Sequence, residues 1–274
     1  MRKETLQWLI PVLLAIALAG ALWFYWSRSG QPEQPAQEPE TDPTEAADEA
    51  PSGLPEHPLE ATDDAPDAQA DLQPLPPLEE SDEYFKLEIS DLFGEPVEER
   101  LVDSNVIERI VATVDNLPRD QIPDRIRPVS GLSDQLVVTE GEGQDEYILD
   151  PRNYERYDAL VEVIANADDN QMEQLYRRFY PLFQRAYVDL GYPQQYFNDR
   201  VIEVIDHLLA TPEVDGPVRL ERPHVLYEYA DPELEELSPG QKLLLRMGNE
   251  HASTVKAKLR EFRSRISTDW AGRD

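Results

Sequence analysis

Cysteine is absent from the 274-residue sequence. Without a thiol there can be no disulfide bond, no thiolate zinc site, no iron–sulfur cluster and no cysteine nucleophile. The absence does not fix the compartment, because an oxidising space tolerates a cysteine-free protein as well as the cytosol does.

Basic residues are scarce, with 25 Lys and Arg against 56 Asp and Glu and a formal net charge of −31. Such an acidic surface repels phosphate backbones, so we expect no nucleic-acid partner. The charge is unevenly distributed, with +2 on residues 1–29, −15 on residues 30–80 and −18 on residues 81–274. These three blocks are treated below as separate units.

Catalytic motifs are also missing. The chain has no G-x-S-x-G elbow, no Walker loop and no G-x-G-x-x-G fingerprint. Among its four histidines, His207 is the most interesting, because Glu203 lies four residues earlier on the same helical face and Asp206 is adjacent. A Glu/His pair at this spacing can ligate a metal, but no H-E-x-x-H or second histidine accompanies it. We therefore predict no catalytic, cofactor-binding or metal-binding residues, and we read His207 as a histidine at the edge of the core.

The amino terminus carries the longest apolar run, LIPVLLAIALAGALWFYW at residues 9–26. Eighteen uncharged residues span roughly 27 Å as a helix, close to the hydrocarbon core of a bilayer. Trp8, Trp23 and Trp26 flank the run, as in aromatic belts, and Arg2 and Lys3 precede it. We expect residues 1–29 to form a single transmembrane helix with its amino end in the cytoplasm. The alternative is a signal peptide cleaved near residues 17–19, which would leave apolar residues at the new terminus.

Residues 30–80 contain eleven prolines, fifteen acidic residues and no Phe, Trp or Tyr. A segment with so little to bury cannot offset the entropy cost of ordering, so we predict a disordered, acidic, Pro-rich tether. Its simplest role is a spacer, and the alternative is a proline-rich ligand around residues 74–77.

Residues 81–274 have the patterns of a mainly helical domain. Ser81 is a candidate cap for a helix reaching Leu92, and Asn105, with Glu108 three residues later, is a candidate capping box for the next. Residues 135–138 and 147–149 favour strands, and Gly141 and Gly143 between them predict a β-hairpin. Further short extended runs are expected at residues 218–220 and 225–229.

The second half of the domain is dominated by helices. An aromatic stripe of Tyr176, Tyr180, Phe183 and Tyr187 indicates helix packing in the core, although Pro181 is expected to kink or split that helix. Residues 238–241, Ser-Pro-Gly-Gln, predict the capping box of the longest helix. That helix carries seven basic residues between positions 242 and 265. We expect them to pair with the acids of the domain itself, and the alternative is contact with an acidic partner or anionic lipid.

Several stretches together resemble a known family: IVATVDNLP at 110–118, NYERY at 153–157, YPLFQRAY at 180–187, LGYP at 190–193, IDHLLATP at 205–212 and QKLLLRMG at 241–248. Over roughly residues 81–265 the chain resembles the proteobacterial family named domain of unknown function 3014. The resemblance implies an N-terminal membrane segment, an acidic Pro-rich tether, this domain and an envelope location. It implies no activity, so no site residues follow from it.

Together these patterns predict a single-pass inner-membrane protein of a Gram-negative bacterium with a helical periplasmic domain. Its expected function is interaction or scaffolding in the cell envelope, with a protein partner there, and it is more readily read as a binding protein than as an enzyme. The alternative is an envelope-directed enzyme with an unrecognised carboxylate/histidine site at Glu203 or Asp206 beside His207.

Overall fold

A computed structural model describes residues 54–59, 74–93, 97, 100–130, 136–143 and 145–267. The expected membrane helix, residues 1–29, and most of the expected tether lie outside these residues. Within the described ranges, none of the helices combines the length and apolar character needed to cross a membrane.

Contacts with the main core begin ahead of Ser81. Leu78, in the short 3₁₀ helix η1 (Leu78–Glu80), is buried in the main core, and Leu75 packs against the same core. The Ser81 hydroxyl donates to the Leu78 carbonyl at 2.7 Å, ending η1, and α3 (Asp82–Phe93) follows at once. Two leucines among the prolines of residues 74–80 are enough to hold this segment on the domain.

Helix α5 (Val106–Asn116) is capped differently from the prediction. Asn105 has a left-handed backbone and its side chain makes no capping bond. Instead, the Asp82 carboxylate accepts from the main-chain N–H groups of Asn105 and Val106, both at 2.7 Å. A carboxylate at a helix amino end also suits the helix dipole, so α3 and α5 are joined electrostatically. A 3₁₀ turn, η2 (Asp124–Ile126), follows α5.

The predicted hairpin is present and belongs to a larger sheet. Strands β1 (Val138–Glu140) and β2 (Glu146–Leu149) pair antiparallel around the two glycines. The sheet continues with β3 (Arg219–Glu221) and β4 (Glu228–Tyr229) in the order β1-β2-β3-β4. It therefore has four antiparallel strands, and a second, smaller core lies beneath it, around Leu149, Leu220 and Leu245.

Between β2 and β3 the chain forms helices α6 (Arg152–Glu155), α7 (Asp158–Ala165), α8 (Asp169–Asp189) and α9 (Phe197–Leu209). Asp168 caps α8, its carboxylate accepting from two N–H groups of the first turn. Helix α8 continues through Pro181 as one element, so the expected split does not occur. It ends at Asp189, and Gly191, just beyond the C-cap Leu190, has a φ of 113°, the left-handed conformation expected after a helix.

The last helices are α10 (Pro232–Glu235) and α11 (Pro239–Ile266). The predicted capping box is confirmed, since Ser238 and Gln241 exchange side-chain-to-backbone bonds. Helix α11 is interrupted at Gly248, which has a φ of 79°. The ring of Tyr154 lies 3.1 Å from the point where a Cβ atom would stand on Gly248. The interruption thus combines a backbone that favours glycine with a close aromatic contact.

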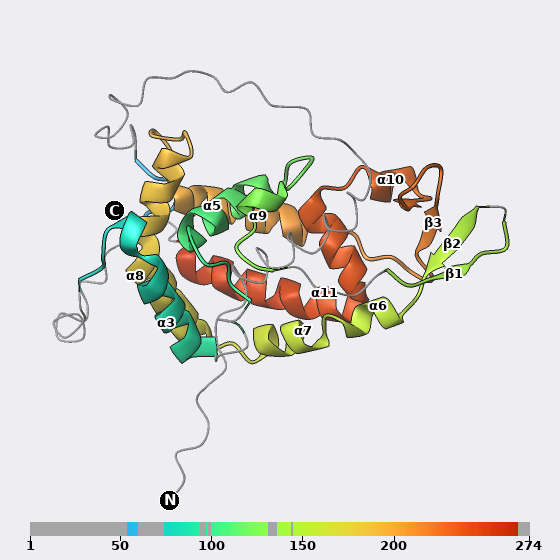
Figure 1. Ribbon diagram of the computed structural model, residues 1–274, viewed down its shortest axis with the longest axis horizontal. Helices are drawn as coiled ribbons and strands as arrows, with labels where there is room; N and C mark the ends of the chain where they lie inside the picture. Colours follow the sequence, from blue (N-terminus) through green and yellow to red (C-terminus); the bar gives the residue numbers. More distant parts are fainter. Residues whose placement is uncertain are drawn as a thin grey trace, which may run out of the picture.

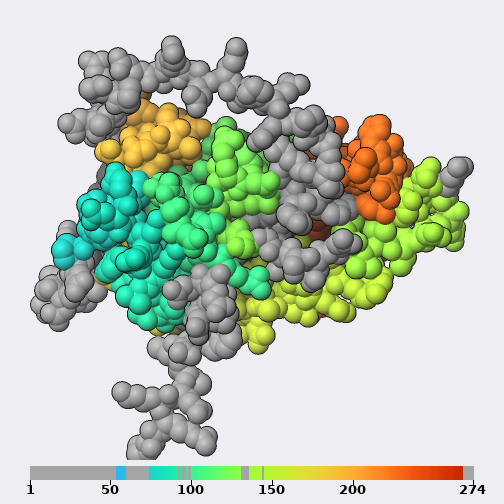
Figure 2. Space-filling view, viewed as in Figure 1, coloured from blue at the N-terminus to red at the C-terminus, as the bar shows by residue number. Residues whose placement is uncertain are grey.

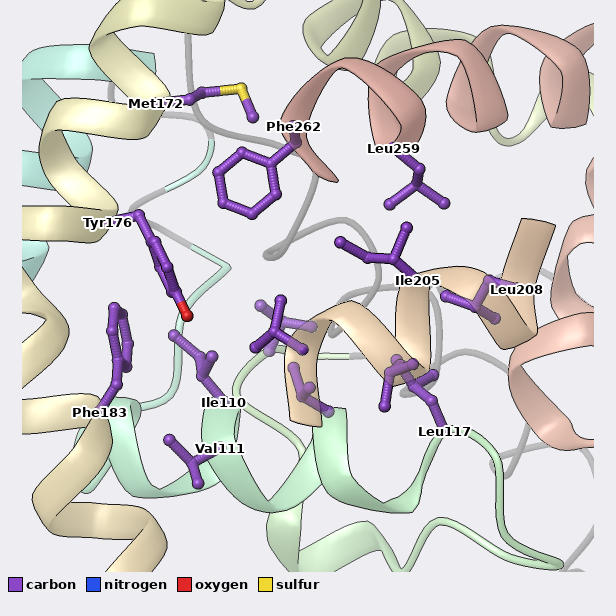
Figure 3. Packing of buried hydrophobic residues seen from close by; sticks show 14 of the residues in the cluster. Ile110, Val111, Leu117, Met172, Tyr176, Phe183, Ile205, Leu208, Leu259 and Phe262 are labelled. Atoms are coloured by element: carbon purple, nitrogen blue, oxygen red, sulfur yellow. The ribbon is translucent and has the colours of Figure 1, made fainter. Parts of the chain in front are cut away.

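Helix α11 runs through the middle of the domain, with α7 and α9 beside it, while the sheet and α10 lie at one end and α3 and α8 at the other (Figure 1). In the space-filling view, α3 and α5 lie in the left part of the visible face and the β1–β2 hairpin lies at the right end (Figure 2). The main core lies where α5, α8, α9 and α11 meet. Figure 3 shows its side chains converging from these four helices, among them Ile110, Tyr176, Phe183, Ile205, Leu259 and Phe262.

Candidate functional site

The three side chains considered for chemistry lie on α9 but have separate partners. Glu203 accepts from Arg200 at 2.7 Å, and Asp206 forms a two-bond ion pair with Arg263 at 2.6 and 2.8 Å. His207 Nε2 lies 2.8 Å from the Ser238 hydroxyl. Neither carboxylate is hydrogen-bonded to the histidine, so the arrangement provides no acid–base pair. Across the part of the chain that the structure describes, His, Asp and Glu side chains form no group of three that could hold a metal ion.

His207 connects α9 to the start of α11. Ser238 is the N-cap of α11, and Gln241 donates from its side-chain amide to the His207 carbonyl at 3.2 Å. Burial lowers the pKa of His207, the charge of Arg200 lowers it further, and Glu203 partly opposes both. A neutral imidazole held against a capping serine is a structural contact between two helices.

Asp115 is the centre of the strongest buried ionic group. Its side chain is 4% exposed and accepts from Arg200 Nε at 2.9 Å and from Arg119 Nη2 at 2.7 Å. Arg200 Nη2 also donates to the Asp115 carbonyl at 2.8 Å. Two guanidinium groups around one carboxylate tie α5 to α9, and each carboxylate oxygen accepts a hydrogen bond from within the domain.

The aromatic stripe of α8 is part of the core, as predicted. Tyr176, Phe183 and Tyr187 are each at most 5% exposed. Burial raises the pKa of Tyr180 to about 12, so its hydroxyl stays protonated and bonds Gln184 at 3.1 Å. The hydroxyl of Tyr176 reaches a buried amide, described below.

The basic residues of α11 make contacts inside the domain, in agreement with the prediction of internal pairing. Four of these contacts are ion pairs with acids on other elements: Lys242–Glu235, Lys258–Asp169, Arg263–Asp206 and Arg265–Glu173. Arg246 lies over the ring of Tyr229, while Arg260 is exposed.

Helix α11 also contains a serine–lysine spacing, Ser253-x-x-Lys256, which the sequence analysis did not identify. The Lys256 ammonium is buried and donates to the Thr211 carbonyl at 2.5 Å. Burial lowers the pKa of Lys256. Ser253 is exposed, and no hydrogen bond joins these two side chains in the described structure, so the spacing does not form a nucleophile–base pair.

A small hollow of about 170 Å³ lies beside the interruption in α11. Its lining includes Tyr154, Gly248 and Asn249. The Asn249 side chain is already bonded to the main-chain N–H and carbonyl of Val214. The hollow therefore offers little polar chemistry to a ligand.

The arrangement most suggestive of function is a short segment, residues 54–59, which bends at Glu56 and His57 and is held at the amino end of α9. The main-chain N–H groups of Glu56 and His57 donate to the two carboxylate oxygens of Asp199 at 3.1 and 2.8 Å. Leu59 packs against the main core, whereas Leu54 is 88% exposed. This is the blue segment in Figure 1, well separated in sequence from the elements it contacts.

Asn198 completes this site. The residue is 1% exposed, and its amide nitrogen donates to the His57 carbonyl at 2.8 Å and to the Ile266 carbonyl at 3.0 Å. Its amide oxygen accepts from the Tyr176 hydroxyl at 3.1 Å. One buried side chain therefore joins α8, α9, the carboxyl end of α11 and residues 54–59. We call residues 54–59 the docked segment, and Asn198 with Asp199 the α9 site.

Part of the chain, including the α9 site, matches a family model. The family model described as protein of unknown function, DUF3014, matches residues 106–263, more than half of the chain. The chain belongs to the DUF3014 family. No curated protein and no solved structure matches significantly. The DUF3014 region contains the α9 site, while the docked segment and α3 lie outside it.

The docked segment was missed because residues 30–80 were read from their average composition. A local signal is nevertheless present, since Leu54 and Leu59 are the only Leu, Ile, Val, Met or aromatic residues between positions 30 and 71. Their partner, the amino end of α9, lies about 140 residues later, and no local pattern reveals such a contact.

Proposed function

We propose that this DUF3014 protein is a membrane-anchored interaction or scaffolding protein of the cell envelope, whose periplasmic domain binds a short segment of a partner protein at the α9 site. The supporting observation is that this site already holds a short stretch of chain, bent at Glu56 and His57. The bonds go to main-chain groups, from side chains built into the fold. Binding of this kind is a recurrent mode of peptide recognition.

The proposed location is supported by the amino-terminal sequence. An apolar run bounded by tryptophans and preceded by Arg2 and Lys3 favours a single span of the inner membrane. The basic flank favours a cytoplasmic amino terminus, so the DUF3014 region would face the periplasm. A domain anchored in this way samples partners in the envelope at a raised local concentration.

Site-specific photo-cross-linking in living cells tests the interaction. A photoreactive residue replaces Gln195, which is exposed and three residues ahead of Asn198. The control carries it at Glu142, which is exposed in the hairpin at the other end of the domain. We expect one recurrent envelope protein to be cross-linked from position 195 and not from position 142. The same adducts from both positions, or none from 195 in an abundant and folded protein, would contradict the proposal.

The membrane location has its own test. Full-length protein should remain in the membrane fraction after alkaline extraction, and protease added to spheroplasts should digest the DUF3014 region. Release by alkali, or protection of the domain until the inner membrane is opened, would overturn the location.

A further inference from the structure

We propose that the α9 site recognises a short, bent Pro-x-x-Pro-apolar segment, and that the chain's own docked segment occupies it in the resting protein as a competitor of the partner. The inference rests on the proposed function in one respect, because competition has a consequence only if a partner exists. Occupation of the site by residues 54–59 is a property of the protein alone and is tested separately.

The bonds define which peptides can bind. Pro55 and Pro58 flank Glu56 and His57, and these two inner residues supply the N–H groups that meet the Asp199 carboxylate. Proline has no N–H, so it is excluded from the inner positions and compatible with the outer ones. The fixed φ of the flanking prolines restricts the backbone before binding, which lowers the entropy cost of docking.

The partner groups on the domain are held ready. Asn198 is fixed by its bonds to Tyr176 and Ile266, so its remaining amide hydrogen is aimed at the carbonyl between the two prolines. Leu59 provides the apolar anchor against the core, immediately after the second proline. A ligand therefore needs an apolar side chain at this position, while the residue equivalent to Leu54 is free to vary because it is exposed.

The docked segment is suited to being displaced. Its described contacts are three hydrogen bonds, one leucine packed on the core and the partly buried side chains of Pro55, His57 and Pro58. Fourteen residues, 60–73, separate it from the next described part of the chain. A tethered ligand at such a distance has an effective concentration in the millimolar range. Weak intrinsic binding is then enough for occupancy, and a tighter ligand can replace it.

Amide hydrogen exchange on the full-length protein tests occupancy. The N–H groups of Glu56 and His57 should be protected, and Asp199→Asn should speed their exchange roughly ten-fold or more, because one acceptor oxygen becomes an amide that itself donates. Asp215→Asn, the same charge change at an exposed position, should leave them unchanged. Equal exchange in all three proteins, at the rate of an unstructured chain, would overturn the inference.

Binding in trans tests competition. A labelled peptide with the sequence of residues 52–61 is added to full-length protein and to the release variant His57→Pro/Leu59→Ser, which lacks one donor and the anchor. We expect binding to the release variant to be about ten-fold tighter or more than to the unmodified chain. Leu54→Ser, which alters only an exposed leucine, should behave like the unmodified chain.

Specificity and stoichiometry complete the test. Adding Asp199→Asn to the release variant, or N-methylating the peptide at the position of Glu56, should abolish binding while the melting temperature shows that the domain is folded. Equal affinity for the unmodified and release chains would overturn competition in cis. A dimer that protects Glu56 and His57 only at high protein concentration would also overturn it, because the occupant would be a second copy. If these tests succeed while cross-linking finds no partner, the proposed function is wrong, and the occupation of the α9 site by residues 54–59 is still supported.

Discussion

At the scale of single residues, the ionic group around Asp115 has the clearest energetic consequence. Asp115→Ala leaves the largely buried Arg200 guanidinium without its main carboxylate. Breaking a buried pair from one side is costly, so we expect a loss of about 3 kcal/mol in the free energy of unfolding, measured by urea denaturation. The matched control is Asp189→Ala, which breaks an exposed pair with Arg185 and should cost less than about 1 kcal/mol. Similar losses in both variants would contradict this reading.

His207 gives the fold a dependence on pH. Its pKa in the folded protein is lowered, first by burial and then by Arg200, so folding favours the neutral ring. The contribution to stability is therefore present above the unfolded pKa of about 6.5 and is lost as pH falls through the lower folded value. We expect the melting temperature to fall less between pH 7.5 and pH 5 in His207→Gln than in the unmodified protein.

The control for His207 is His224→Gln, at an exposed histidine, which should leave the pH profile unchanged. His207→Gln also separates the structural interpretation of this histidine from the enzymatic one. If His207→Gln retained the full pH dependence and lost a cellular phenotype, the contact with Ser238 would not explain the residue's role.

At the scale of elements, the interruption in α11 predicts an unusual glycine requirement. Gly248→Ala places a Cβ in a left-handed backbone and 3.1 Å from the Tyr154 ring. We expect a loss of about 1–3 kcal/mol in unfolding free energy, measured by thermal or urea denaturation. Gly216→Ala is the control, because Gly216 also has a positive φ, 87°, but open space around it. A smaller loss of unfolding free energy in Gly216→Ala would give the contribution of the Tyr154 contact at Gly248. Equal losses in the two variants would mean that this contact contributes nothing to the cost.

Helix ends that depend on adjacent residues could be predicted from the sequence. Helix ends and strand pairings that depend on distant residues could not. Ser238 with Gln241 marked the start of α11, and Gly191 marked the end of α8, because capping is written within a few positions. The amino end of α5 was misassigned because its cap comes from Asp82, more than twenty residues earlier. The extended runs that became β3 and β4 were recognised, but their addition to the hairpin depends on pairing across a long insertion.

The residues of the candidate site show the same limit, because their partners are set by the fold and not by neighbouring positions. Glu203, Asp206 and His207 are close in sequence, yet they have separate partners. Glu203 bonds Arg200 of the same helix, whereas Asp206 and His207 bond Arg263 of α11 and its N-cap Ser238. Asn198 and Asp199 were not singled out, because their role depends on a segment about 140 residues away. The absence of catalytic motifs remains an observation about the sequence.

At the scale of the whole molecule, charge determines the response to salt. The formal net charge of −31 includes −18 on residues 81–274, so mutual repulsion among acids opposes compactness. Raising NaCl from about 20 to 300 mM shortens the Debye length severalfold and screens this repulsion. We expect the melting temperature to rise, measured by calorimetry, with KCl as a control for a sodium-specific effect. A fall would mean that ion pairs such as Arg263–Asp206 outweigh the repulsion.

The position of the docked segment also has a mechanical consequence. Tension applied to the chain ahead of Leu54 reaches the three hydrogen bonds at Asp199 and Asn198 before it reaches α3. These bonds are few, so they yield before the packed helices of the domain do. The docked segment would act as a breakable link that spares the helical domain from force.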